Sequence, residues 1–229
     1  MLNRFGISKP LIKYEIHSET AGASKILNLL RENKNIALIS DAGMPLISDP
    51  GSNLIASCIA ENIPLTVISG PCACINAVVL SGLDTRSFCM LGFLPDKKKD
   101  RDTYIARFSD LQSTLVIYCP PHDLDDYLNY LYSRLGSRKI AIVREMTKIY
   151  EEVVYGALGQ PIQVNRKGEM VIVIEGAEPK ENPLLTLSVI NHFDYYIKSG
   201  MTKNEAIKSV AKERGVHKSE IYKEINLVK

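Results

Sequence analysis

The stretch NIALISDAGMPLISDPG, Asn35–Gly51, decides how the N-terminal part of this chain is expected to fold. It opens with a short apolar run, Ile36–Ser40, which is typical of a buried strand and which ends abruptly at Asp41. The glycines, prolines and second aspartate that follow predict a turn-rich loop. In open α/β sheets, ligands bind outside the carboxyl ends of the strands. The stretch therefore predicts either a ligand-binding loop or a plain strand-to-helix connection with Asp49 as the helix N-cap.

A second loop of interest follows the next predicted strand, Leu65–Ile68. The loop forms the first residues of the segment Gly70–Leu83, GPCACINAVVLSGL. In this segment a Gly-Pro turn leads directly into a predicted helix of small residues. A helix N-terminus carries unsatisfied N–H groups and partial positive charge, which suit a carboxylate ligand. Tight packing of the helix on a sheet is the alternative reason for small residues. With Leu11–Ile16 and Phe88–Leu91 as further strands, the alternation of strands and helices predicts an α/β fold with a parallel sheet.

The second half of the chain repeats this alternation. The further predicted strands are 114–118, 140–143, 151–155 and 170–174, with a helix at Leu124–Leu135. Two strands end in loops rich in polar or turn-forming residues, CPPHD at Cys119–Asp123 and REMTK at Arg144–Lys148. Between the halves, the charged run Asp96–Arg101 predicts a linker between domains; a solvated helix start and a phosphate contact are the alternatives.

The C-terminal segment has a different character. After a predicted helix at Pro183–Ser199, Thr202 and Glu205 have the spacing of a capping box. Gly215 makes a turn and Ser219 starts a second helix, which is helix-turn-helix spacing. The outer face of these helices is basic, through Lys203, Lys208, Lys212, Lys218 and Lys223. This face is either simply solvated or a docking surface for RNA.

The amino-acid composition limits the kinds of protein and binding site that this chain can form. A net charge of +2 neither requires nor forbids a nucleic-acid partner. The five cysteines lack paired CxxC spacing, which argues against a disulfide framework and a zinc site, so we expect a reduced, cytoplasmic setting and no metal. No apolar stretch is long enough to predict a membrane span. Because tryptophan is absent and aromatic residues are few, we do not expect a base-stacking platform of the kind that single-strand-binding proteins use.

The segments DAGMPLISDPG, GPCACINAVVLSGL and LGFLP together resemble the tetrapyrrole-methylase superfamily of S-adenosylmethionine (SAM) methyltransferases. Within it, the chain is most similar to bacterial enzymes that methylate the 2′-hydroxyl of a cytidine in the decoding centre of 16S ribosomal RNA. The resemblance covers essentially the whole chain. It implies a two-domain α/β methyltransferase, with a SAM-binding domain at 1–95, a second α/β domain at 96–180 and a helix-turn-helix-like helical tail at 181–229.

The resemblance also implies roles for particular residues. The SAM-binding residues would be Asp41, Gly43, Met44, Pro45, Cys72 and Ala73, and S-adenosyl-L-homocysteine would be the product. Removing the proton of a ribose hydroxyl requires a base, or a cation that lowers the pKa of the hydroxyl; Glu145, Lys148 and His122 match the family at that site. Each has a structural alternative: Glu145 pairs with Arg144, His122 caps a helix, and Lys148 is simply solvated.

This chain departs from the family pattern in three charged positions. Cys119 and Asp123 replace a glutamate and an arginine, and Leu91 replaces an acidic residue. Relatives also begin with a strand and loop upstream of the position of Leu2, so we expect an unpaired sheet edge and exposed apolar surface here. The implied partners are 16S rRNA in the 30S subunit and a second copy in a homodimer. An inactive RNA-binding remnant and a tetrapyrrole methyltransferase are the alternative functions.

Overall fold

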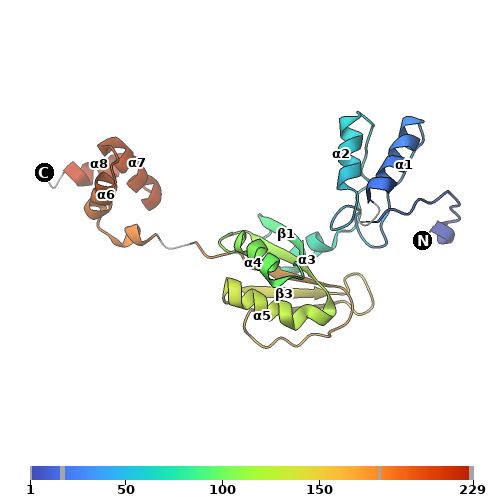
Figure 1. Ribbon diagram of the computed structural model, residues 1–229. Coiled ribbons are helices and arrows are strands. Elements are labelled where there is room, and N and C mark those ends of the chain that lie inside the picture. Colours follow the sequence, from blue (N-terminus) through green and yellow to red (C-terminus); the bar gives the residue numbers. More distant parts are fainter. Residues whose placement is uncertain (1, 16–18, 180–181, 227–229) are drawn as a thin grey trace. The chain divides into compact units, whose positions relative to one another are not determined.

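The computed structural model describes residues 2–15, 19–179 and 182–226. It divides into two compact units, Met1–Ala177 and Glu178–Lys229. Figure 1 shows the elements of each unit in sequence colours. The first unit also contains a short 3₁₀ helix, η1 (Leu2–Phe5).

A five-stranded sheet lies at the centre of the first unit, with the strand order β1-β2-β5-β3-β4. The strands are β1 (Phe88–Phe93), β2 (Thr114–Cys119), β3 (Lys139–Arg144), β4 (Glu152–Ala157) and β5 (Met170–Ile174). β1 is parallel to β2, whereas β5 is antiparallel to both β2 and β3. β1, β2 and β3 therefore run in one direction, and the loops that follow them leave from the same edge of the sheet.

Helices cover both faces of this sheet. Side chains of α4 (Lys98–Ala106) and α5 (Leu124–Leu135) pack with Leu115 and Ile117 of β2, whereas those of α3 (Ala73–Ser81) pack with Val116 from the same strand. Successive side chains of a strand point to opposite faces, so the two clusters lie on opposite sides of the sheet. Every residue of β5 is buried, as expected for a strand covered on both faces.

The predicted strands at 36–40 and 65–68, and the described part of the one predicted at Leu11–Ile16, are wrong: within the described ranges these residues pair with no strand. Ile16 itself lies outside the described residues. Apolar side chains of these segments remain in solvent; Val67 is 72% exposed and Ile68 91% exposed. An apolar run favours a strand, but a strand forms only where a neighbour accepts its hydrogen bonds. The expected exposed apolar surface is thus present.

The helices of this N-terminal region pack on each other instead. α1 (Glu19–Arg31) and α2 (Ser52–Ala60) lie side by side (Figure 1) and share a small core of Ala23, Ile26, Leu27, Leu54 and Cys58. An ion pair between Arg31 and Glu61, with Nη2 and Oε1 2.6 Å apart, joins the ends of the two helices. This pair is partly exposed, so the apolar contacts supply most of the stabilisation.

The charged run Asp96–Arg101 is not a linker, because α4 already begins at Lys98. Arg101 folds back toward α5, where it donates a hydrogen bond to Asp126 and lies 5.2 Å from the ring centroid of Tyr127. The prediction of a linker is therefore wrong, and the helix start that was its alternative is correct. A run of charges predicted solvation, but the arginine in it packs its stem and head group on aromatic rings.

The second unit is a small helical cluster. After a short 3₁₀ turn, η4 (Pro183–Thr186), it contains α6 (Val189–Lys198), α7 (Lys203–Arg214) and α8 (Lys218–Asn226). Its core consists of Val189, Phe193, Ala206, Ile207, Val210, Ala211 and Ile221. The predicted capping box of Thr202 and Glu205 is present, and Gly215 ends α7 in the left-handed conformation, which leads into α8. The five lysines of the predicted basic face are all exposed.

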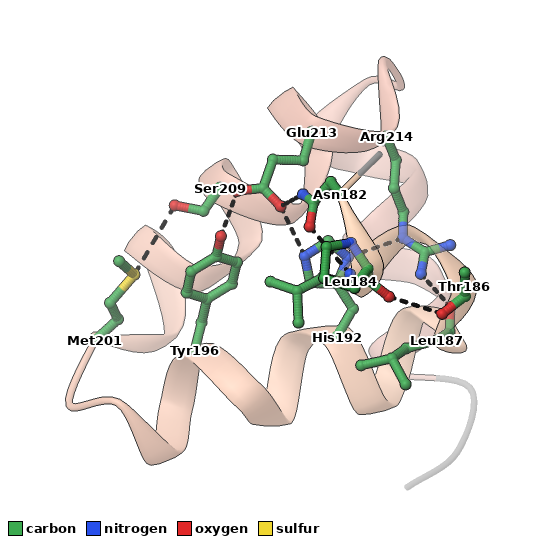
Figure 2. Close-up of polar contacts among 11 residues, drawn as sticks. Asn182, Leu184, Thr186, Leu187, His192, Tyr196, Met201, Ser209, Glu213 and Arg214 are labelled. Carbon is green, nitrogen blue, oxygen red and sulfur yellow. Dashed lines mark hydrogen bonds and ion pairs between the residues drawn. The ribbon is translucent and has the colours of Figure 1, made fainter. Parts of the chain in front are cut away.

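A polar cluster lies beside this apolar core (Figure 2). His192 is fully buried, and its Nε2 lies 2.9 Å from Oε2 of Glu213. Its Nδ1 accepts a hydrogen bond from Nε of Arg214 at 3.2 Å, so the ring proton is on Nε2, because a guanidinium only donates. Glu213 also accepts from Asn182 at 2.6 Å and from the Tyr196 hydroxyl. The cluster thereby ties the start of the unit and α6 to α7.

Candidate functional site

Three loops that are distant in sequence come together in the first unit. Gly43 has a φ of +69°, and a Cβ at this position would lie 3.3 Å from the carbonyl oxygen of Pro71. A Cβ at Gly92, in β1, would lie 3.5 Å from Oγ of Ser48. The loop after Asp41 thus touches both the Gly-Pro turn before α3 and the carboxyl end of β1.

The backbone of this loop is strained. Leu46 and Ser48 have φ values of 70° and 65°, which residues with a Cβ rarely adopt. Oγ of Ser40 donates to the carbonyl oxygen of Gly43 at 3.0 Å and holds the first turn. Asp49 is not a helix N-cap, because Gly51 occupies that position before α2. Backbone strain of this kind persists where the surroundings enforce it, and it is concentrated at functional sites.

The N-terminus of α3 has no side-chain cap. Its N-cap residue is Cys72, which makes no capping hydrogen bond, and Sγ of Cys72 lies 3.4 Å from Sγ of Cys74. Burial, together with the hydrogen bond to Cys72, raises the pKa of Cys74 to about 11. The Cys74 thiol therefore stays neutral near pH 7 and adds no negative charge at this helix end.

Tyr118 at the carboxyl end of β2 is a member of the site that the sequence did not single out. Burial raises the pKa of Tyr118 to about 12, and Tyr118 packs on the same apolar cluster as Cys72 and Cys74 at the start of α3. Its ring packs against that of Phe93, with centroids 5.5 Å apart. The signal that points to it is its position as the last residue of a predicted strand, where sheet proteins place ligand contacts.

Glu145 and Lys148 lie in the β3–β4 loop at the same edge of the sheet. Nζ of Lys148 is 2.9 Å from Oε1 of Glu145 and 2.8 Å from Oε2 of Glu169. The backbone N–H of Glu169 also donates to Glu145 at 2.8 Å. Hydrogen bonds from Glu169 and Lys148 lower the pKa of Glu145, and those to Glu169 and Glu145 raise the pKa of Lys148. At neutral pH the pair is a carboxylate and an ammonium group.

Arg144 has a structural role. It is 6% exposed, and its guanidinium contacts Glu152 at 2.8 Å and the carbonyl oxygen of Lys167 at 3.2 Å. The alternative that Glu145 serves only to pair with Arg144 is therefore wrong in the described part of the chain. Met146, next to Glu145, packs on the same apolar cluster as Cys72 and Ala73, which places the β3–β4 loop near the start of α3.

His122 is more loosely held. It lies in the 3₁₀ turn η3 (Pro121–Asp123) after β2, with its side chain 79% exposed and Nε2 3.5 Å from Oδ2 of Asp123. Asp123 is the N-cap residue of α5, so His122 does not cap that helix. In the described part of the chain, His122 has no hydrogen bond to Glu145 or Lys148. It shares their edge of the sheet but is not brought into contact with them.

Two of the departures from the family pattern have a physical reason. Cys119 and Leu91, which replace acidic residues, are 2% and 5% exposed and belong to the core between the sheet and α5. Burial raises the pKa of Cys119 to about 12, so this position carries no charge. Apolar residues avoid the cost of burying a carboxylate at both places.

Among the described residues, no group of three or more His, Cys, Asp or Glu side chains is arranged to hold a metal ion. No helix in that part of the chain combines the length and apolar character needed to cross a membrane.

Comparison with known proteins gives the family. Residues 9–162 match the family model described as Tetrapyrrole (Corrin/Porphyrin) Methylases. The chain belongs to this family. It is 40% identical over 230 residues to "Ribosomal RNA small subunit methyltransferase I" of Halalkalibacterium halodurans. The matched region covers 97% of this chain and 80% of that protein. The protein of the same name from Bacillus subtilis is 34% identical over 227 residues, covering 95% and 78%.

The solved structures support the same fold. The crystal structure of the methyltransferase CobJ superposes with a TM-score of 0.54 at 16% identity, covering 69% of this chain and 72% of that one. This likeness shows the fold of a tetrapyrrole methylase. The predicted family, the predicted α/β fold class and the predicted methyltransferase class are confirmed.

Proposed function

We propose that this protein transfers a methyl group from SAM to the 2′-hydroxyl of a cytidine of 16S rRNA within the 30S subunit, at the decoding centre. The observation that carries the proposal is the 40% identity, over nearly the whole chain, to a protein named as a ribosomal RNA small subunit methyltransferase. The similarity extends beyond residue 162, where the family model ends, into the helical unit.

The residues at the sheet edge fit SAM. The uncapped start of α3, at Cys72 and Ala73, offers N–H groups to a carboxylate. Gly43 keeps its loop clear of side-chain atoms beside Pro71, and Met44 and Pro45 are half-buried next to it. Asp41 is exposed and can accept hydrogen bonds from an ammonium group or a ribose hydroxyl. SAM held there would supply a methyl group on a sulfonium sulfur, and S-adenosyl-L-homocysteine, a neutral thioether, would be the leaving group.

Glu145 and Lys148 suit the remaining task, which is to handle the proton of the ribose hydroxyl. The Lys148 ammonium group can stabilise the developing alkoxide, and the Glu145 carboxylate can accept the proton. Because hydrogen bonds lower the pKa of Glu145 in this state, it becomes an effective base only if substrate displaces one of them. His122, exposed on the same edge, is the second candidate base.

RNA recognition is proposed for the second unit. Its exposed lysines lie on α7 and α8, the two helices with helix-turn-helix spacing. Lysine side chains supply affinity for phosphate oxygens without reading sequence. We further propose that the protein acts in the cytoplasm as a homodimer. The observation that supports the homodimer is the exposure of apolar residues such as Val67 and Ile68, because such residues are typical of an interface between subunits.

The first experiment is calorimetric titration of S-adenosyl-L-homocysteine into the chain, into Asp41→Asn and into Asp194→Asn. Asp194 is exposed in α6 of the other unit and serves as a charge-matched control. We expect binding to the wild type and the control and loss of binding in Asp41→Asn. A folded wild-type chain that binds neither this compound nor SAM would refute the SAM site.

The second experiment follows methyl transfer from labelled SAM to 30S subunits from cells that lack the protein, with nucleoside analysis for 2′-O-methylcytidine. Transfer to that nucleoside supports the proposal. Cofactor binding without transfer would indicate an inactive RNA-binding protein, and transfer only to a corrin or sirohaem precursor would indicate a tetrapyrrole enzyme. Size-exclusion chromatography with light scattering tests the homodimer, and a monomer at micromolar concentration would contradict it.

A further inference from the structure

The loop between β3 and β4 presents two large apolar side chains to solvent. Ile149 is 94% exposed and Tyr150 is 72% exposed. The Tyr150 ring has no aromatic or cationic partner among the described residues. An exposed apolar pair on an ordered loop that also carries Glu145 and Lys148 is a candidate contact surface for substrate.

This loop is held in a strained conformation. Glu145 and Thr147 have φ values of 51° and 63°, and the left-handed region is particularly unfavourable for a β-branched residue such as threonine. The carboxylate of Glu151 accepts a hydrogen bond from the backbone N–H of Thr147. The backbone N–H of Lys148 donates to the carbonyl oxygen of Glu145 at 3.0 Å. Tyr150 is thereby fixed on a rigid turn, two residues from Lys148.

The chemistry around Tyr150 favours a base over a phosphate. Three carboxylates lie in or next to the turn, at Glu145, Glu151 and Glu152, and each already accepts a hydrogen bond. Glu145 and Glu152 are paired with Lys148 and Arg144, so the turn has no unpaired cation among these groups to attract a phosphate, whereas an uncharged base needs none. Proteins that read single-stranded RNA stack unpaired bases on aromatic side chains. One such residue is compatible with a chain that has no tryptophan and few aromatic residues.

We propose that Tyr150 stacks on a nucleobase of the RNA substrate, next to the nucleotide whose ribose is methylated. The proposal rests on the proposed function. It makes Tyr150 a residue that positions the substrate, because stacking would hold an unpaired nucleotide while Lys148 faces the ribose hydroxyl. Ile149, at the same tip, would cover the edge of the stacked base.

The test compares Tyr150→Phe, Tyr150→Leu and Tyr150→Ala. Phenylalanine keeps a flat π face, whereas leucine keeps the apolar surface without it. We expect Tyr150→Phe to methylate 30S subunits with wild-type KM, and the other two to raise KM for 30S by about 5- to 100-fold. The affinity for S-adenosyl-L-homocysteine should stay unchanged in all three. A merely structural role would instead lower the melting temperature or that affinity.

A direct readout uses the absence of tryptophan from the chain. Tyr150→Trp introduces the single tryptophan of the chain, whose fluorescence should be quenched by stacking on a base when unmethylated 30S subunits are added. Phe5→Trp is the control, since Phe5 is similarly exposed at 68% and lies outside the site. Equal quenching of both variants, or no quenching of an active Tyr150→Trp, would overturn the proposal.

The activity of the wild type distinguishes a failure of the stacking proposal from a failure of the proposed function. An active wild type with an equally active Tyr150→Leu refutes stacking alone. A wild type that transfers no methyl group to 30S subunits refutes the proposed function, and the stacking proposal falls with it.

Discussion

Gly43 gives a sharp test of the candidate site, because Gly82 provides a control with the same backbone conformation. Their φ values are 69° and 70°. A Cβ at Gly43 would lie 3.3 Å from the carbonyl oxygen of Pro71, whereas one at Gly82, at the C-cap of α3, would meet no atom of the described residues within 4 Å. Alanine at either position therefore brings the same strain, but only Gly43→Ala presses on a neighbouring loop.

The magnitudes follow from this geometry. An L-residue in the left-handed conformation costs about 1–2 kcal/mol, so both variants should lose about that much free energy of unfolding. In a unit of this size, this corresponds to a fall in melting temperature of about 2–8 °C. The contact at 3.3 Å additionally forces the Gly43 loop and the Pro71 turn apart by a few tenths of an ångström. Binding sites require placement to within about half an ångström, so we expect Gly43→Ala to weaken cofactor binding about tenfold or more.

The assay combines urea denaturation with calorimetric titration of S-adenosyl-L-homocysteine. The expected pattern is a loss of stability in both variants, no smaller in Gly43→Ala than in Gly82→Ala, and weaker binding only in Gly43→Ala. If Gly43→Ala binds as tightly as wild type, the contact of these two loops does not form the cofactor site. If Gly82→Ala weakens binding equally, strain at α3 and not the loop contact is responsible.

Three further predictions concern other parts of the molecule. Burial raises the pKa of Glu213, but hydrogen bonds from the polar cluster outweigh it and keep that pKa below its usual value. The stabilisation is thus present above the unfolded pKa of about 4.3 and lost as pH falls through the lower folded value. The stability difference between wild type and Glu213→Gln, followed by circular dichroism, should therefore shrink as pH falls below about 4.3, and a constant difference would contradict this. Lys148→Met should retain cofactor affinity and lower kcat on 30S subunits by about a hundredfold, whereas an unchanged kcat would mean that Lys148 is simply solvated. Leu131→Ala removes a fully buried side chain between α5 and the sheet and should cost about 2–5 kcal/mol in urea denaturation; a loss below about 1 kcal/mol would show that the core collapses around the site.

Elements whose signals are local were predictable from the sequence. The helix at Leu124–Leu135 and the strand at Met170–Ile174 have the predicted bounds, since an amphipathic period with a closing glycine and a β-branched run each specify their element. The predicted strands at 36–40 and 65–68 failed for the opposite reason. Their apolar residues favour a strand, but no pairing partner lies beside them among the described residues.

In the candidate site, too, local features could be predicted from the sequence and tertiary contacts could not. The motifs around Gly43 and Cys72 could be singled out as ligand-binding loops from their glycines, prolines and small residues. Their contact through Pro71 could not, because it depends on how α3 packs on the sheet. Tyr118 was missed, since a tyrosine at the end of a β-branched run has the composition of an ordinary strand.

The sequence by itself determined the family, the α/β class and the capping box of α7, because these depend on short motifs and on residues within one turn of each other. Only the tertiary structure decided which charges meet. Arg144 and Glu145 are neighbours in sequence, yet Arg144 pairs with Glu152 of β4, and Glu145 pairs with Lys148 and the backbone of Glu169. The register of β3 with β4 places Arg144 opposite Glu152, whereas Glu145 lies just beyond the end of β3, where the backbone turns into the left-handed conformation.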